Sequence, residues 1–190
     1  MSVPEFHKFD DQIGDIATVG EFWRWAMSDL LGNRNRGILA EYIVGKLIGA
    51  DLSHPRIEWT CYDLTYGKHS IEVKSSAYVQ SWHTRDSKRY QLSFGIAPHS
   101  CWDAKKNTVS REKRRWADVY VFCVFPAESH HDTRDVLNLA EWRFFVATTP
   151  HINDYVSLKS KQIGIRTVRR ICGSAVGYAE LKHKIDSILT

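Results

Sequence analysis

Residues 62–74 read YDLTYGKHSIEVK, and this stretch decides the fold. Apolar and polar residues alternate on both sides of Gly67 and Lys68, which predicts two β-strands joined by a tight turn. A two-residue loop with glycine in the first place is typical of a type II′ turn, which fixes the register of a hairpin. We therefore expect four facing pairs: Tyr66 with His69, Thr65 with Ser70, Leu64 with Ile71, and Asp63 with Glu72.

This register brings two acidic side chains together. Facing residues have Cβ atoms roughly 4.5–5.5 Å apart, so the carboxylates of Asp63 and Glu72 repel each other unless something neutralises them. Lys74 projects from the same face as Glu72, whereas Ile71 and Val73 point to the opposite, apolar face. Two carboxylates beside an ammonium group suit Mg²⁺, which proteins hold through one or two carboxylates together with substrate and water. Lys74 would then orient or deprotonate a water that attacks a phosphate.

A plainer interpretation of the hairpin stands beside this one. Glutamate and lysine two residues apart are common on solvated strands, and an aspartate at the start of a strand is often a turn residue. Glu41 favours the first interpretation, because it lies in the nearly all-apolar helical segment of residues 37–49, GILAEYIVGKLIG. A buried carboxylate is costly unless it is paired or binds a metal. The structural alternative is an ion pair of Glu41 with Arg34, Arg36 or Lys46.

The rest of the chain predicts a sheet with helices packed on it. Helical spacing of apolar residues predicts helices over residues 19–31, 37–49, 136–142 and 179–189. Alternating or evenly apolar runs predict strands over residues 59–66, 69–79, 90–96, 117–125 and 143–149. The run ADVYVFCVF at 117–125 is so apolar that we expect a central strand covered on both faces.

This order of elements indicates an α/β (mixed α+β) fold, with a central mixed β-sheet flanked by helices. Its length fits one domain. We expect a single domain of residues 1–190, made of an N-terminal helical extension (1–36), a core (37–149) and a C-terminal loop and helix (150–190).

The composition is that of an ordinary globular chain. The 190 residues are 43% hydrophobic and 25% charged, which excludes a disordered, collagen-like or coiled-coil protein. A net charge of +4 permits nucleic-acid binding without requiring it. No apolar run reaches membrane-spanning length and the N-terminus lacks a signal-peptide pattern, so we expect a cytoplasmic protein with no membrane partner. The four cysteines contain no C-x-x-C pair, and we expect them to be reduced, with Cys61 and Cys123 in the core.

Several of these features occur together in one order: Glu41 on a helix, then Asp63, then Glu72-Val73-Lys74 on paired strands, and then the apolar strand of residues 117–125. This pattern resembles the PD-(D/E)xK nuclease superfamily, whose fold is called restriction-endonuclease-like. The resemblance covers roughly residues 37–125. Tyr62 stands where the motif has its proline, a departure that is frequent in the superfamily.

The resemblance implies a Mg²⁺-dependent deoxyribonuclease in which Mn²⁺ can substitute for Mg²⁺. Asp63 and Glu72 would be metal ligands, and the backbone carbonyl of Val73 a third ligand. Lys74 would help to activate water, and Glu41 would orient the metal or its water. The implied chemistry is in-line hydrolysis of DNA phosphodiester bonds, in restriction, defence or repair. Cutting both strands would favour a homodimer.

Basic and aromatic residues outside the hairpin are candidates for contacts with nucleic acid. One basic cluster comprises Lys105, Lys106, Arg111, Lys113, Arg114 and Arg115. A second comprises Lys159, Lys161, Arg166, Arg169 and Arg170. A third set follows the acid-x-lysine strand and comprises Trp82, His83, Arg85, Lys88, Arg89 and Tyr90, with Gln80 as a further polar candidate. The alternative for these sets is ordinary solvated surface, and for Trp82 a place in the core.

Two other functions remain open from the sequence. One is a nuclease-fold module that binds nucleic acid or a protein partner without cleaving. The other is a scaffold in which Glu72 and Lys74 are surface residues and Glu41 is salt-bridged. The sequence His130-His131-Asp132 lacks the further ligand spacing of a zinc site. No phosphate-binding loop, dinucleotide-binding motif or α/β-hydrolase motif occurs in the chain.

Overall fold

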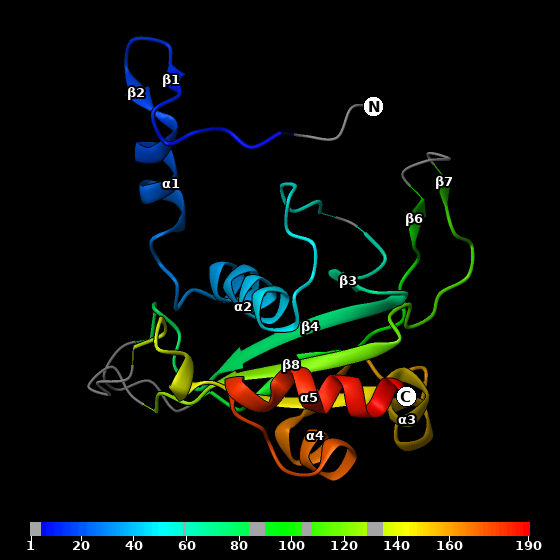
Figure 1. Cartoon of the computed structure of the whole chain (residues 1–190). Helices are drawn as coiled ribbons and strands as arrows, with labels where there is room; N and C mark the ends of the chain where they lie inside the picture. Colours follow the sequence, from blue (N-terminus) through cyan, green and yellow to red (C-terminus); the bar gives the residue numbers. More distant parts are fainter. Residues whose placement is uncertain (1–4, 59, 84–89, 104–107, 129–134) are drawn as a thin grey trace.

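The computed structural model describes residues 5–58, 60–83, 90–103, 108–128 and 135–190 (Figure 1). Short strands and helices at the N-terminus precede a central sheet, and helices follow it. In chain order the elements are β1 (Gln12–Ile13), β2 (Ala17–Thr18), α1 (Val19–Met27), α2 (Asn33–Ile48), β3 (Leu64–Tyr66), β4 (His69–Ala77), β5 (Ser93–Gly95), β6 (Trp102–Asp103), β7 (Thr108–Val109), β8 (Val119–Phe125), the 3-10 turn η1 (Leu139–Glu141), β9 (Arg143–Thr148), α3 (Thr149–Tyr155), β10 (Gln162–Gly164), α4 (Ile165–Cys172) and α5 (Tyr178–Leu189).

The largest sheet in the described part of the chain has four strands in the order β3-β4-β8-β9. β3 runs antiparallel to β4, β4 parallel to β8, and β8 antiparallel to β9. Every residue of β8 is buried, which confirms the prediction of a central strand covered on both faces. The expected mixed sheet flanked by helices, an α/β (mixed α+β) fold, is therefore confirmed.

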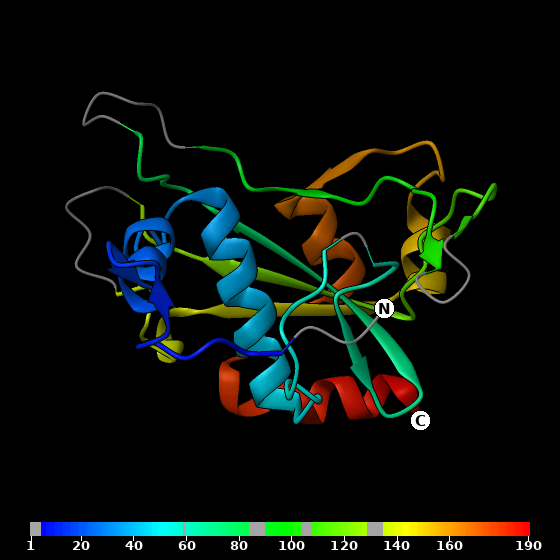
Figure 2. The ribbon, with the colours of Figure 1, turned by 90° about the horizontal axis from the view of Figure 1, so that it is seen from above.

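Both faces of this sheet carry a hydrophobic core, because side chains alternate along its strands. Ile71 and Val73 of β4 belong to the core under α2 and α5, together with Val121 of β8. Tyr120 and Phe122 of β8 point to the opposite face, into a core that includes α3, α4, β5 and β10. Figure 1 shows α2 on one side of β4 and β8 and α4 on the other, and Figure 2 shows α2 crossing over the strands.

The hairpin has the expected register over three of its four pairs. Gly67 adopts a φ of +59°, a conformation that glycine allows at the turn without strain. The observed pairs are Tyr66 with His69, Thr65 with Ser70, and Leu64 with Ile71.

The fourth expected pair, Asp63 facing Glu72 across the ladder, is wrong. The backbone N–H of Asp63 donates to the carbonyl of Ile71 at 3.0 Å, and its carboxylate Oδ2 accepts the N–H of Val73 at 2.7 Å. An aspartate side chain thus takes the place of a backbone partner, and the strand pairing ends at Leu64. Within the described residues, no strand pairs with residues 72–77 of β4 on this side.

Other elements differ from the expected ones at their ends. The strand expected over 59–66 is limited to β3, and the helix expected over 136–142 is only the turn η1. Helices α3 and α4 were not predicted. Thr148 caps α3 and Pro150 lies in its first turn, which is the local signal for its start. In α4, Ile165, Val168 and Ile171 recur every three residues, a spacing that puts one apolar side on the sheet.

The N-terminal elements β1, β2 and α1 stand apart from the sheet (Figure 1). Phe9, which precedes β1, packs edge-to-face on Trp23 of α1, with ring centroids 5.0 Å apart. Trp25 of α1 is 84% exposed. No helix in the described part of the chain has the length and apolar character to cross a membrane.

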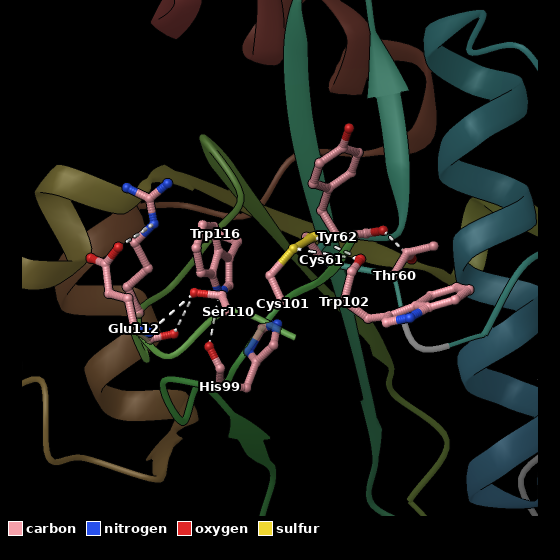
Figure 3. Close-up of a disulfide and its surroundings, with 10 residues drawn as sticks. Thr60, Cys61, Tyr62, His99, Cys101, Trp102, Ser110, Glu112 and Trp116 are labelled. Carbon is pink, nitrogen blue, oxygen red and sulfur yellow. Dashed lines mark hydrogen bonds and ion pairs between the residues drawn. A yellow bond between two sulfur atoms is a disulfide. The ribbon is translucent and has the colours of Figure 1, made fainter. Parts of the chain in front are cut away.

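Two of the four cysteines are not reduced, contrary to the expectation from the sequence. Cys61 and Cys101 form a disulfide, with Cα atoms 4.8 Å apart, so Cys61 is not a reduced core residue (Figure 3). The two residues are 40 positions apart in sequence, which is why spacing alone did not pair them. Cys123 is buried as expected, and burial raises the pKa of its thiol. The disulfide links the segment just before Asp63 to the start of β6.

Loss of this disulfide should lower the stability of the oxidised protein. Closing a loop of this length corresponds to roughly 4 kcal/mol of unfolded-chain entropy, so Cys101→Ser should lower the free energy of unfolding by up to that amount. Urea unfolding measures the change, and reductant should destabilise the wild type but not the variant. Cys172→Ser, which removes a free half-buried thiol, is the control and should cost less than about 1 kcal/mol. Equal losses in the two variants would contradict the prediction.

Candidate metal and phosphodiester site

Glu72 and Lys74 lie next to each other on one face of β4, as their spacing predicts. Glu72 is only 6% exposed, and its Oε1 accepts a hydrogen bond from Nζ of Lys74. Their partners in the parallel strand β8 are Tyr120 and Phe122, whose side chains belong to the hydrophobic core on this same face of the sheet. Glu72 is therefore a buried acid, which contradicts its interpretation as a surface residue, whereas Lys74 is partly exposed.

Asp63, which lies just before the start of β3, reaches the same part of β4. Its bond from the N–H of Val73 fixes its carboxylate beside the residue that separates Glu72 and Lys74. In a strand, the N–H and carbonyl of one residue point to the same neighbour, so the carbonyl of Val73 also faces the edge where Asp63 lies. The structure thus brings Asp63 close to Glu72 and Lys74, through a side-chain bond and not through the expected strand pairing.

The charged side chains of the candidate site shift one another's pKa values. Burial raises the pKa of Glu72, and the neighbouring Asp63 carboxylate raises it further, against the lowering effect of Lys74. Burial lowers the pKa of Lys74, but the carboxylates of Glu72, Asp63 and Glu41 outweigh it, so the net pKa lies above the ordinary lysine value. Three acids therefore influence one ammonium group at this edge of the sheet.

Glu41 projects from α2 toward the same charges and is paired, but not with an expected partner. Arg56 forms a two-bond ion pair with it, through Nε and through Nη2, the latter 3.0 Å from Oε1. Burial raises the pKa of Glu41 more than Arg56 lowers it, and Asp63 raises it too. The pairing with Arg34, Arg36 or Lys46 is thus wrong. Arg56 lies in a loop with no periodic pattern, so the sequence held no signal for it.

The donor set fits a hard divalent cation that keeps several waters. Asp63 and Glu72 offer carboxylate oxygens, and Val73 offers a carbonyl on the same edge, which are the ligand types that Mg²⁺ prefers. No group of three or more His, Cys, Asp or Glu side chains in the described residues is arranged as a complete metal site. Any ion here would therefore depend on water and substrate oxygens for the rest of its coordination.

A cleft of about 430 Å³ opens beside Lys74, near the C-terminal half of β4. Trp82, His83 and Tyr90 line it, and Trp82 and Tyr90 are 63% and 47% exposed, so Trp82 is not a core residue. Gln80 also lines the cleft but is buried, where its Oε1 accepts a hydrogen bond from Arg36 at 2.8 Å.

Arg36 is fully buried beneath this cleft, and sequence reasoning missed that role. Its guanidinium donates to Ser75 Oγ at 3.2 Å, Asn33 Oδ1 at 2.7 Å, Gln80 Oε1 and the carbonyl of Leu31 at 2.9 Å. Burial lowers its pKa to about 10. Ser75, Asn33 and Gln80 all line the cleft, so one buried cation fixes three of its polar side chains.

The basic clusters have mixed roles. Arg115 is buried and donates to the carbonyls of Ile96 and Ser157, so it is a structural residue and not a phosphate contact. Arg114 stacks on Trp116, 4.0 Å from the ring centroid. Like Arg114, the following members are exposed: Arg111, Lys113, Lys159, Lys161, Arg166, Arg169 and Arg170. Outside the described residues lie Arg85, Lys88, Arg89, Lys105, Lys106, His130, His131 and Asp132.

Comparisons with known proteins add no family to these observations. No protein-family model matches the chain, and no curated protein matches it.

Proposed function

We propose that this protein is a divalent-metal-dependent endonuclease that hydrolyses phosphodiester bonds of DNA. The observation that carries the proposal is the buried Glu72, which contacts Lys74 on the same strand face and is repelled by Asp63. Burying one acid beside another is costly unless a cation uses both. The order Glu41, Asp63, Glu72-Val73-Lys74, which resembles the PD-(D/E)xK nucleases, supports the same chemistry.

Each residue of the group has a part in this reaction. Asp63 and Glu72 would hold Mg²⁺, or Mn²⁺ in its place, and the carbonyl of Val73 would add a ligand. The bound metal supplies Lewis-acid stabilisation of the charge that develops on the scissile phosphate. Lys74, held by Glu72, would orient the attacking water and keep a positive charge against the phosphate. Glu41, fixed by Arg56, would orient the metal or its water from the side of α2.

Exposed basic side chains near the C-terminus would provide contacts with the DNA backbone. Lys161 precedes β10, whose Gln162 lines the cleft, and Arg166 and Arg169 lie on the following helix α4. Contacts of this kind give affinity without sequence preference. Cleavage of both strands of a duplex would need a second active site, which a homodimer supplies.

A second candidate is a module of the same fold that binds nucleic acid or a partner without cleaving. It is favoured by the two ion pairs, because Arg56 already satisfies Glu41 and Lys74 already satisfies Glu72. In that case the acids serve the structure and need no metal.

Incubation of supercoiled plasmid with the purified protein separates the two candidates. We expect nicked or linear plasmid in the presence of Mg²⁺ or Mn²⁺ and none in EDTA. The cleaved ends should be a phosphate and a hydroxyl, as hydrolysis requires. Retarded plasmid on a gel with no cleavage in either metal would support the non-cleaving module and contradict the nuclease.

A further inference from the structure

The cleft beside Lys74 has the size and lining of a ligand site. Its volume of about 430 Å³ is within the usual range of pockets for small organic ligands. Lys74 lines this cleft and also donates a hydrogen bond to Glu72 of the candidate site. A ligand in the cleft would therefore lie directly beside the group that we propose to cleave phosphodiesters.

The lining combines flat aromatic rings with hydrogen-bonding groups. The ring centroids of Trp82 and His83 are 6.2 Å apart, and those of His83 and Tyr90 are 6.4 Å apart, so three rings follow one another along one wall. Trp82 exposes most of its surface and Tyr90 nearly half, although large aromatic side chains are normally covered. Stacking on exposed rings is how proteins hold unpaired nucleobases.

The polar side of the cleft is fixed in place from below. Arg36 holds Asn33, Ser75 and Gln80 through its guanidinium, so these side chains are ordered before any ligand binds. Gln162 of β10 lines the cleft with an exposed amide. Amides and hydroxyls both donate and accept hydrogen bonds, which matches the edge of a nucleobase.

We infer that this cleft takes the base of an unpaired nucleotide of DNA, next to the phosphate presented to Lys74. This inference deepens the proposed function, on which it rests, by naming the substrate class: DNA with a bulged, mismatched or single-stranded nucleotide. A paired base would first have to break its base pair and leave the stack, which costs free energy that an unpaired base largely avoids. Perfectly paired duplex is therefore the poorer ligand.

Binding measured without cleavage tests the inference. Fluorescence anisotropy in EDTA compares three labelled oligonucleotides of equal length: a paired duplex, the same duplex with one bulged nucleotide, and that duplex with an abasic bulge. We expect the wild type to bind the bulged duplex at least tenfold more tightly than the other two. Trp82→Ala should weaken binding to the bulged duplex by about 5- to 150-fold, the effect of losing one stacked base.

Trp25→Ala is the matched control, because Trp25 is also exposed but lies on α1, apart from the sheet. It should keep the preference for the bulge. Equal binding of the three oligonucleotides, undetectable binding, or a preference that survives Trp82→Ala would overturn the inference. The outcome is independent of cleavage: a bulge preference in a protein that never cuts DNA would refute the nuclease and leave the base site standing.

Discussion

Replacing Lys74 by alanine is expected to lower the rate of the proposed DNA cleavage by about 10²–10³-fold, the usual contribution of one positioned donor that stabilises the charge developing in the transition state. This expectation follows from the contacts of Lys74. Lys74 is the cation in contact with the buried Glu72, and it also lines the cleft. The rate is best measured under single-turnover conditions, so that DNA affinity does not limit it.

Two controls separate chemistry from folding in this experiment. Lys68→Ala removes an exposed lysine at the hairpin turn and should leave the rate unchanged. Lys74→Gln keeps a polar side chain but removes the charge, and it should lose cleavage as well, while both Lys74 variants unfold in urea as one transition. A Lys74→Ala protein that is folded and cleaves at more than a tenth of the wild-type rate would refute the role of Lys74.

Arg36→Met should destabilise the fold by roughly 3–5 kcal/mol, because it removes a buried cation and leaves its acceptors without a donor. Arg36 is fully buried, and its guanidinium bonds the carbonyl of Leu31 and three side chains that line the cleft. Methionine fills much of the same volume, so the loss reports hydrogen bonds more than packing. Urea unfolding gives the free energy.

Arg34→Met is the matched control for Arg36→Met. The two arginines are two positions apart on α2, but the side chain of Arg34 is 78% exposed. Substitution at Arg34 should change the free energy of unfolding by less than about 0.5 kcal/mol. A loss below about 1 kcal/mol for Arg36→Met would show that the guanidinium does not hold this region together.

Local sequence rules were sufficient for the parts of the fold that depend on neighbouring residues. The glycine at the hairpin turn and the alternation around it predicted the observed register, and the apolar run of 117–125 predicted the buried strand β8. The position of Asp63 failed the same rules, because its carboxylate bonds the backbone N–H of Val73 and ends the ladder. Side-chain bonds to the backbone compete with strand pairing in a way that periodicity does not record.

Contacts between distant residues were the part that sequence could not supply. Arg56 reaches Glu41 across 15 positions, Arg36 reaches Gln80 across 44, and Cys61 pairs with Cys101 across 40. In each case several partners of the same chemical type are available, and only the packing of loops against the sheet selects one. The closeness of Asp63 to Glu72 and Lys74 was nevertheless expected, since a Glu-x-Lys strand after an earlier acid is a local pattern.

The most direct test of the proposed chemistry compares the wild-type protein with Glu72→Gln on supercoiled plasmid in Mg²⁺, at equal protein concentration and after equal melting behaviour has been established. Glutamine keeps the shape of Glu72 and removes its charge, so it should leave the fold intact and take away a metal ligand. We expect the wild type to nick or linearise the plasmid and Glu72→Gln to leave it supercoiled. Equal cleavage by both proteins, or cleavage by the wild type that persists in EDTA, would contradict a metal-dependent site at Glu72.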